Sequence, residues 1–84
     1  MFFVNCFDYN CSMVEFDRRV FAERLKELRN ERGIKQRALA KTLDLSNSSI
    51  SYWETCKQEP TAGALYKLAC YFNVSVDYLL GLED

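Results

Sequence analysis

The side chains with binding chemistry gather in the middle of the chain. Within six residues the sequence offers an amide, two hydroxyls and a phenol, at Asn47, Ser48, Ser51 and Tyr52. Cationic and polar side chains surround them, at Lys35, Gln36, Arg37, Ser46, Thr55 and Lys57. Amides and hydroxyls donate and accept hydrogen bonds, and Lys and Arg attract anions. This combination suits recognition of a polar, anionic partner.

Catalytic and metal chemistry have little support. The sequence has no histidine, no phosphate-binding glycine loop and no nucleophile with an evident base. Its four cysteines, at positions 6, 11, 56 and 70, form no CxxC pair, so zinc-site spacing is absent. We therefore expect no enzymatic activity, no metal and no cofactor.

Composition describes one small globular domain with an uneven charge. The chain has 84 residues and a net charge of −1, yet residues 17–57 hold ten Lys or Arg against six Asp or Glu. A face that is locally positive can recruit phosphate even on a slightly acidic protein. Apolar runs do not exceed five residues, far below the roughly 20 that span a bilayer. We expect no membrane contact and a cytoplasmic location.

Helical periodicity and caps organise residues 17–84 into a compact all-α bundle of five short helices. The first is expected over 17–32, with Asp17 as its N-cap and Phe16 packed on Phe21. The second starts near Gln36, and the third runs from 46 to about 54 with Ser46 as its cap. Caps at Thr61 and Ser75 begin the last two helices, the fifth of which ends at Gly81.

Residues 36–55, QRALAKTLDLSNSSISYWET, resemble the helix-turn-helix of the lambda-repressor-like (XRE or Cro-type) family of phage and bacterial regulators, and the match extends over about 21–80. The resemblance implies a lambda-repressor-like DNA-binding domain over 17–84 whose second and third helices form the motif. It also implies a sequence-specific regulator of transcription, a repressor that binds a palindromic double-stranded operator as a homodimer. Three residues depart from the family pattern: Lys35 at a cap, and Asp44 and Cys56 where glycine is common.

The resemblance assigns roles to the central side chains. Those expected to face base edges are Asn47, Ser48, Ser51 and Tyr52; the alternative is a merely solvated polar face. Those expected near phosphates are Lys35, Gln36, Arg37, Ser46, Thr55 and Lys57, with Gln36 the strongest candidate. For the charged residues of this set, the alternative is an exposed charge that contacts no partner. For Ser46 the alternative is a role as the cap of the third helix alone. No arginine stands on the base-facing side, so we expect DNA shape to carry much of the specificity.

Two further groups are expected to serve structure or assembly. Family members hold the equivalents of Arg29 and Glu54 as an internal salt bridge, and we favour that structural role over DNA contact. The carboxyl-terminal apolar residues either close the core or form a dimer seam: Val76, Tyr78, Leu79, Leu80 and Leu82.

Residues 1–16 lie outside the resemblance and form an amino-terminal extension rich in aromatic residues. We expect it to lack fixed structure unless it acts as an arm on a second subunit or partner; Met13 is an alternative start. A different function also fits the sequence, namely the DNA-binding antitoxin of a toxin-antitoxin pair or a protein-binding adaptor. A small protein partner, a toxin or an antirepressor, would favour that alternative.

Overall fold

The computed structural model describes residues 16–83, which contain five helices and no strand. The helices are α1 (Arg18–Arg32), α2 (Gln36–Thr42), α3 (Ser49–Glu54), α4 (Ala62–Phe72) and α5 (Val76–Leu80). The predicted all-α architecture is confirmed. The expectations for residues 1–15 fall outside the described part of the chain.

Side-chain caps start three of the helices where the sequence predicts them. The Asp17 carboxylate accepts a hydrogen bond from the Arg19 amide at 2.9 Å, and the Phe16 and Phe21 rings pack 6.0 Å apart between centroids. Thr61 and Ser75 cap α4 and α5 in the same way, accepting from amides three residues ahead. These caps set the entry of the chain into each helix.

The start of α3 differs from the prediction. The helix begins at Ser49 rather than at Ser46, and Ser48 occupies the N-cap position without a side-chain hydrogen bond to the helix. The Ser46 hydroxyl instead hydrogen-bonds to the Ser49 hydroxyl at 2.6 Å. Ser46 is therefore not the cap of α3, and residues 46–48 form a turn that leads into it.

Within one or two residues of its end, every helix is followed by a residue in the left-handed conformation; these are Gly33, Asp44, Cys56, Asn73 and Gly81. In each case the following amide donates to a carbonyl five residues back, as the Lys57 amide does to Tyr52 at 2.8 Å. Cys56 has φ 63°, a conformation that costs a residue with a Cβ more than it costs glycine. Two of the departures from the family pattern thus occupy glycine-like backbone.

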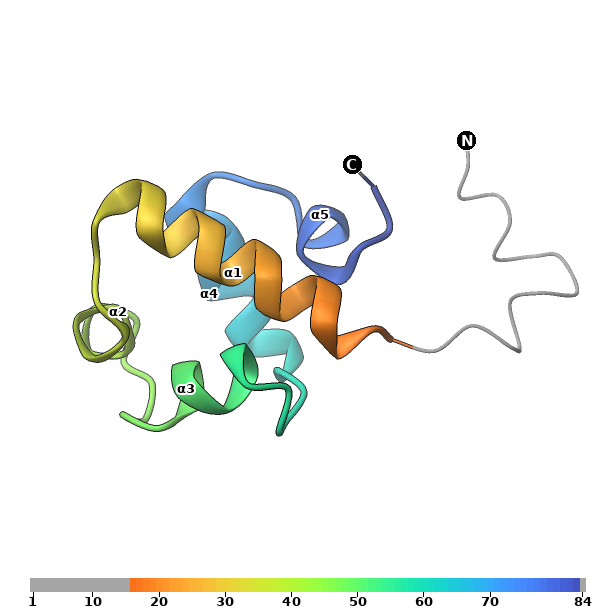
Figure 1. Cartoon of the computed structure of the whole chain (residues 1–84). Coiled ribbons are helices and arrows are strands. Elements are labelled where there is room, and N and C mark those ends of the chain that lie inside the picture. Colours follow the sequence, from red (N-terminus) through yellow and green to blue (C-terminus); the bar gives the residue numbers. More distant parts are fainter. Residues whose placement is uncertain (1–15, 84) are drawn as a thin grey trace, which may run out of the picture.

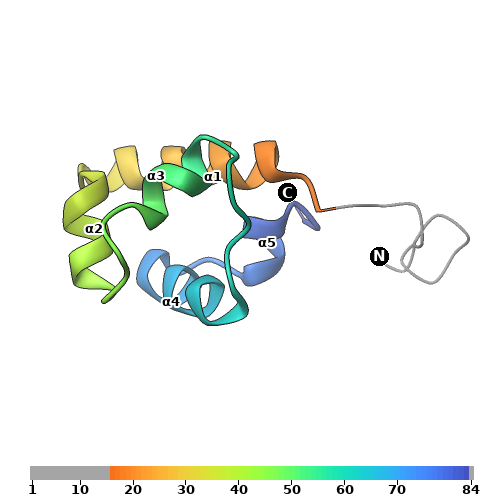
Figure 2. The ribbon, with the colours of Figure 1, turned by 90° about the horizontal axis from the view of Figure 1, so that it is seen from below.

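The core lies between α1, α3 and α4, with α2 and α5 closing its ends (Figures 1 and 2). Each helix contributes fully buried side chains, among them Leu25, Leu39, Ile50, Leu68 and Leu79. Phe21 and Trp53 meet edge to face at 6.1 Å and join α1 to α3. This packing holds α3 along the lower edge of the domain in Figure 1, with one side against the core and the other facing out.

Candidate nucleic-acid interface

The outer side of α3 and the turn before it present the four predicted base-contacting residues. Asn47 and Ser48 are exposed in the turn, Ser51 is half-buried, and 39% of Tyr52 is exposed. Spacings of three and four residues place Ser48, Ser51 and Tyr52 on one helix face. Ile50 and Trp53 point the other way and are buried. Two hydroxyls and a phenol thus share one helix face, and the Asn47 amide is exposed in the turn that leads into it.

A buried ion pair fixes this surface to the rest of the domain. Arg29 of α1 donates to both carboxylate oxygens of Glu54 at the end of α3, through Nε at 2.7 Å and Nη2 at 3.0 Å. Only 4% of the Glu54 side chain is exposed. Arg29 also donates through Nη1 to the Ile34 carbonyl at 3.1 Å, just before α2. A single guanidinium therefore joins α1, the start of α2 and α3.

Gln36 extends this network. Its amide nitrogen donates to Oε1 of Glu54 at 2.9 Å, so the start of α2 is tied to the end of α3. The sequence predicts a phosphate contact for Gln36; the structure adds an internal partner that sequence reasoning missed. No local signal links the two positions, because they lie 18 residues apart.

The other predicted phosphate contacts occupy two ends of the same surface. Lys35 and Arg37 are exposed at the start of α2, and Lys57 is exposed beyond α3. Thr55 is exposed too, but its hydroxyl donates back to the Ser51 carbonyl at 2.8 Å. Ser46 is exposed in the turn before α3.

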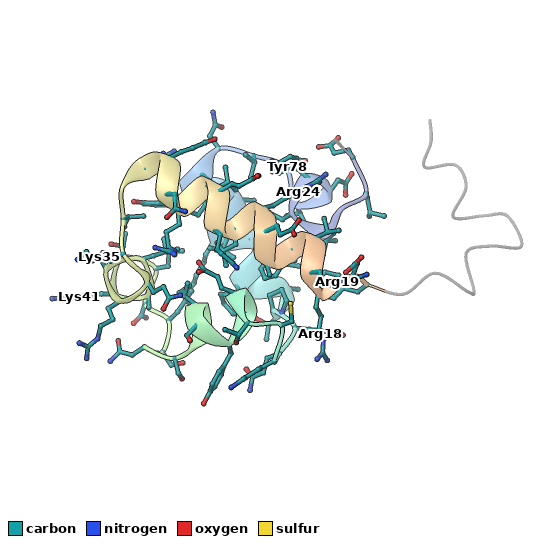
Figure 3. The ribbon with its side chains drawn as sticks, in the orientation of Figure 1. Arg18, Arg19, Arg24, Lys35, Lys41 and Tyr78 are labelled. Carbon is teal, nitrogen blue, oxygen red and sulfur yellow. The ribbon has the colours of Figure 1, made fainter. Side chains whose placement is uncertain are left out.

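Two cations that the sequence analysis did not single out lie near these ends. Lys41 is exposed on α2, and Figure 3 shows it beside Lys35 at one end of the domain. Arg18, at the start of α1, lies against the turn that ends α3: its Nη1 is 3.4 Å from the Cys56 carbonyl. In the sequence only the positive charge of Arg18 and Lys41 distinguishes them, and residues 17–57 contain ten Lys or Arg in all.

The carboxyl-terminal residues divide between the core and the surface. Leu79 is completely buried within one chain, so it closes the core, which is the alternative to a dimer seam that the sequence leaves open for these residues. Val76, Tyr78 and Leu80 are half-buried, whereas 53% of Leu82 is exposed. Arg24 of α1 stacks on the Tyr78 ring at 4.3 Å and donates to the Glu83 carbonyl at 2.6 Å, which holds the tail against α1.

An apolar groove adjoins this tail. It is lined chiefly by Phe16, Val20, Pro60, Leu80 and Leu82.

No helix among residues 16–83 has the length and apolar character to cross a membrane. Within the same residues no three His, Cys, Asp or Glu side chains form a group that could hold a metal ion.

The chain is similar to bacterial and phage regulators. It is 39% identical over 62 residues to the HTH-type transcriptional regulator ImmR of Bacillus subtilis (strain 168), across 74% of this chain and 49% of that protein. It is 37% identical over 62 residues to Repressor protein C2 of Salmonella phage P22, across 74% of this chain and 29% of that protein. The chain thus spans about half or less of the length of these relatives.

Solved structures agree with the sequence relatives. The P22 c2 repressor in complex with a synthetic operator matches with a TM-score of 0.71 and 36% identity, over 76% of this chain and 97% of that one. The hypothetical transcription factor NHTF from Neisseria shares the fold, with a TM-score of 0.70 and 24% identity over 80% of this chain and 83% of that one. The profile of the family described as Helix-turn-helix matches residues 25–79. The predicted resemblance is therefore confirmed, and the chain belongs to the lambda-repressor-like helix-turn-helix family.

Proposed function

We propose that this protein is a sequence-specific regulator of transcription that binds double-stranded DNA through α3. One observation carries the proposal: the polar outer face of α3 is accessible while its other face and its end are locked into the domain by Trp53, Glu54 and Arg29. A DNA major groove about 12 Å wide admits one helix, and a rigidly held helix keeps its side chains in register with base edges.

The side chains on this face suit direct readout of bases. The Asn47 amide can pair bidentately with adenine, and the Tyr52 ring can contact a thymine methyl. Hydroxyls at Ser48 and Ser51 bond to several bases and discriminate less. Because no arginine lies on this face to bind guanine, we propose that DNA shape supplies the rest of the specificity.

Backbone contacts would come from the two ends of the surface. Lys35, Gln36 and Arg37 stand at the start of α2, and Ser46, Thr55 and Lys57 flank α3. Such contacts set affinity and orientation without reading sequence. The similarity to the P22 c2 repressor, solved in complex with an operator, supports this arrangement.

We further propose that the protein acts as a homodimer on a palindromic operator, represses transcription and works in the cytoplasm. A dimer places two recognition helices one turn of DNA apart, about 34 Å. Exposed Leu82, with its half-buried neighbours Val76, Tyr78 and Leu80, supplies apolar surface for the seam. Repression then follows from occupancy of the operator.

Selection of bound fragments from random duplex DNA tests this function. The full chain is expected to enrich a palindrome whose half-sites lie about one turn apart. The matched control is the double variant Asn47→Ala with Tyr52→Ala, checked for unchanged helix content by circular dichroism. The proposal would be contradicted if the wild type enriched no palindrome, or if the double variant enriched the same palindrome equally well. Co-purification of a small protein in fixed stoichiometry would instead favour the antitoxin or adaptor alternative.

A further inference from the structure

Arg18 occupies an unusual place for a residue outside the helix-turn-helix. It is the first residue of α1, yet its side chain reaches the turn that ends α3. Its Nη1 lies 3.4 Å from the Cys56 carbonyl, and its Nε lies 3.5 Å from a carboxylate oxygen of Glu59. The side chains of Arg18 and Glu59 are both about half exposed. Figure 3 shows Arg18 on the side of the domain where α3 lies.

The turn against which Arg18 rests is fixed in space. The amides of Cys56 and Lys57 donate back to the Trp53 and Tyr52 carbonyls, which ties the turn to the last residues of α3. The Cys56 carbonyl immediately precedes Lys57 along the chain, and Lys57 is among the residues proposed to contact phosphate. The Arg18 guanidinium therefore lies next to the carboxyl-terminal end of the proposed DNA surface.

The present partners of Arg18 are weak ones. An exposed ion pair with a single contact at 3.5 Å contributes little, because water screens it and two long side chains must be ordered. The 3.4 Å hydrogen bond to the Cys56 carbonyl is long for an N–H donor. A phosphate can offer a guanidinium two short, charge-assisted hydrogen bonds at once. Arg18 can therefore exchange Glu59 for a phosphate at low cost.

We propose that Arg18 is a further DNA-backbone contact, whose guanidinium leaves Glu59 for a phosphate when DNA binds. This inference rests on the proposed function and extends the binding surface from the helix-turn-helix to the amino end of α1. Glu59 then has a role as well: it competes with a DNA phosphate for Arg18 and so lowers the affinity of the protein for DNA.

The neighbouring residue provides a matched control. Arg19 belongs to the same turn of α1 and carries the same charge, but it pairs with Asp17 at 3.5 Å and its side chain is largely exposed. Figure 3 shows both residues at the amino-terminal end of α1, with Arg18 nearer to α3. Successive residues of an α-helix lie about 100° apart around its axis, so the two side chains leave α1 in different directions. Arg18→Ala and Arg19→Ala therefore remove equal charge from different surfaces.

Titration of a fluorescent duplex carrying the selected site, at several salt concentrations, measures the contact. Arg18→Ala is expected to reduce the slope of log affinity against log salt by about 0.9 unit per subunit, whereas Arg19→Ala leaves it near the wild-type value. Arg18→Lys keeps the charge and should retain most of the slope. Equal slopes for the two alanine variants would overturn the inference, while salt-insensitive or absent binding by the wild type would overturn the proposed function itself.

A double-mutant cycle tests the exchange with Glu59. Glu59→Gln is expected to raise affinity several-fold in the wild type, because it frees Arg18 and removes a negative charge near DNA. In the Arg18→Ala background the gain should be clearly smaller, since only the general repulsion is relieved. An equal gain in both backgrounds would show that Glu59 does not compete for Arg18.

Discussion

Tyr52 is the largest side chain on the outer face of α3, and 39% of it is exposed. If it reads a base, Tyr52→Ala should cost about 1–3 kcal/mol of binding free energy at one operator position and relax preference there. Affinity measurements on operators changed one base pair at a time test this. Tyr66→Ala is the matched control, because Tyr66 is also exposed but lies on α4. Equal losses on every operator would contradict base reading by Tyr52.

Lys57 stands at the end of the same surface and should behave in the opposite way. Lys57→Ala is expected to weaken binding to all sequences alike and to lower the salt slope by about one unit per subunit. Titrations of one specific and one unrelated duplex at several salt concentrations measure both effects. An unaltered slope would remove Lys57 from the phosphate contacts.

Cys56 departs from the family pattern at a position with φ 63°, where a Cβ is strained. Cys56→Gly should therefore stabilise the protein by about 1 kcal/mol, the strain relieved less the entropy that glycine loses. Cys70→Gly is the matched control: Cys70 lies exposed within α4, so the same change should destabilise by a similar amount. Urea unfolding measures both, and a loss of stability in Cys56→Gly would contradict the strain argument.

At the scale of elements, the sequence predicts most of what local chemistry decides. Caps at Asp17, Thr61 and Ser75 begin their helices as expected, because each depends on residues two or three positions away. The start of α3 differs from the expectation because two hydroxyls of one turn, at Ser46 and Ser49, pair with each other. The bonds of Gln36 to Glu54 and of Arg18 to Cys56 escape prediction because they exist only once the helices have packed.

The cap of α1 gives the fold a response to acid. The hydrogen bond from the Arg19 amide holds the pKa of Asp17 below its ordinary value of 3.8. A carboxylate whose pKa is lowered by folding stabilises the folded state at any pH above its pKa in the unfolded chain. That stabilisation is lost as the pH falls through the pKa of the folded state. Below about pH 4 the wild type should therefore lose thermal stability faster than Asp17→Asn, which caps without titrating. Parallel melting curves over pH would contradict this.

The junction of α1, α2 and α3 depends on the Arg29–Glu54 pair. Arg29→Ala leaves the buried Glu54 carboxylate without its main partner and should cost about 3–5 kcal/mol of folding free energy. Arg32→Ala, on the same helix but exposed, should cost well under half of that. Urea unfolding of the two variants compares them directly. Equal costs would mean that the buried pair has no special role in positioning α3.

At the scale of the whole molecule, the proposed DNA surface and the carboxyl-terminal tail are held by different contacts. The pair of Arg29 with buried Glu54 fixes α3, whereas Arg24 holds the tail through the Tyr78 ring and the Glu83 carbonyl. Leu79 shows why the seam could not be predicted completely: leucine at the end of a short helix suits a core or an interface equally, and only packing assigns it to the core. Leu82 remains as the most exposed apolar residue of the tail.

Leu82 therefore provides the test of assembly. Burial of a leucine at an interface stabilises by about 1.5–3 kcal/mol when complete, so Leu82→Ser should raise the dimer dissociation constant at least several-fold while the fold is retained. DNA affinity should then fall most at low protein concentration, because dimer formation and operator binding are linked. Sedimentation and titration at several protein concentrations measure both effects, with Tyr66→Ser as a control for loss of exposed apolar surface elsewhere. The same dissociation constant in both variants would place the dimer seam away from the tail.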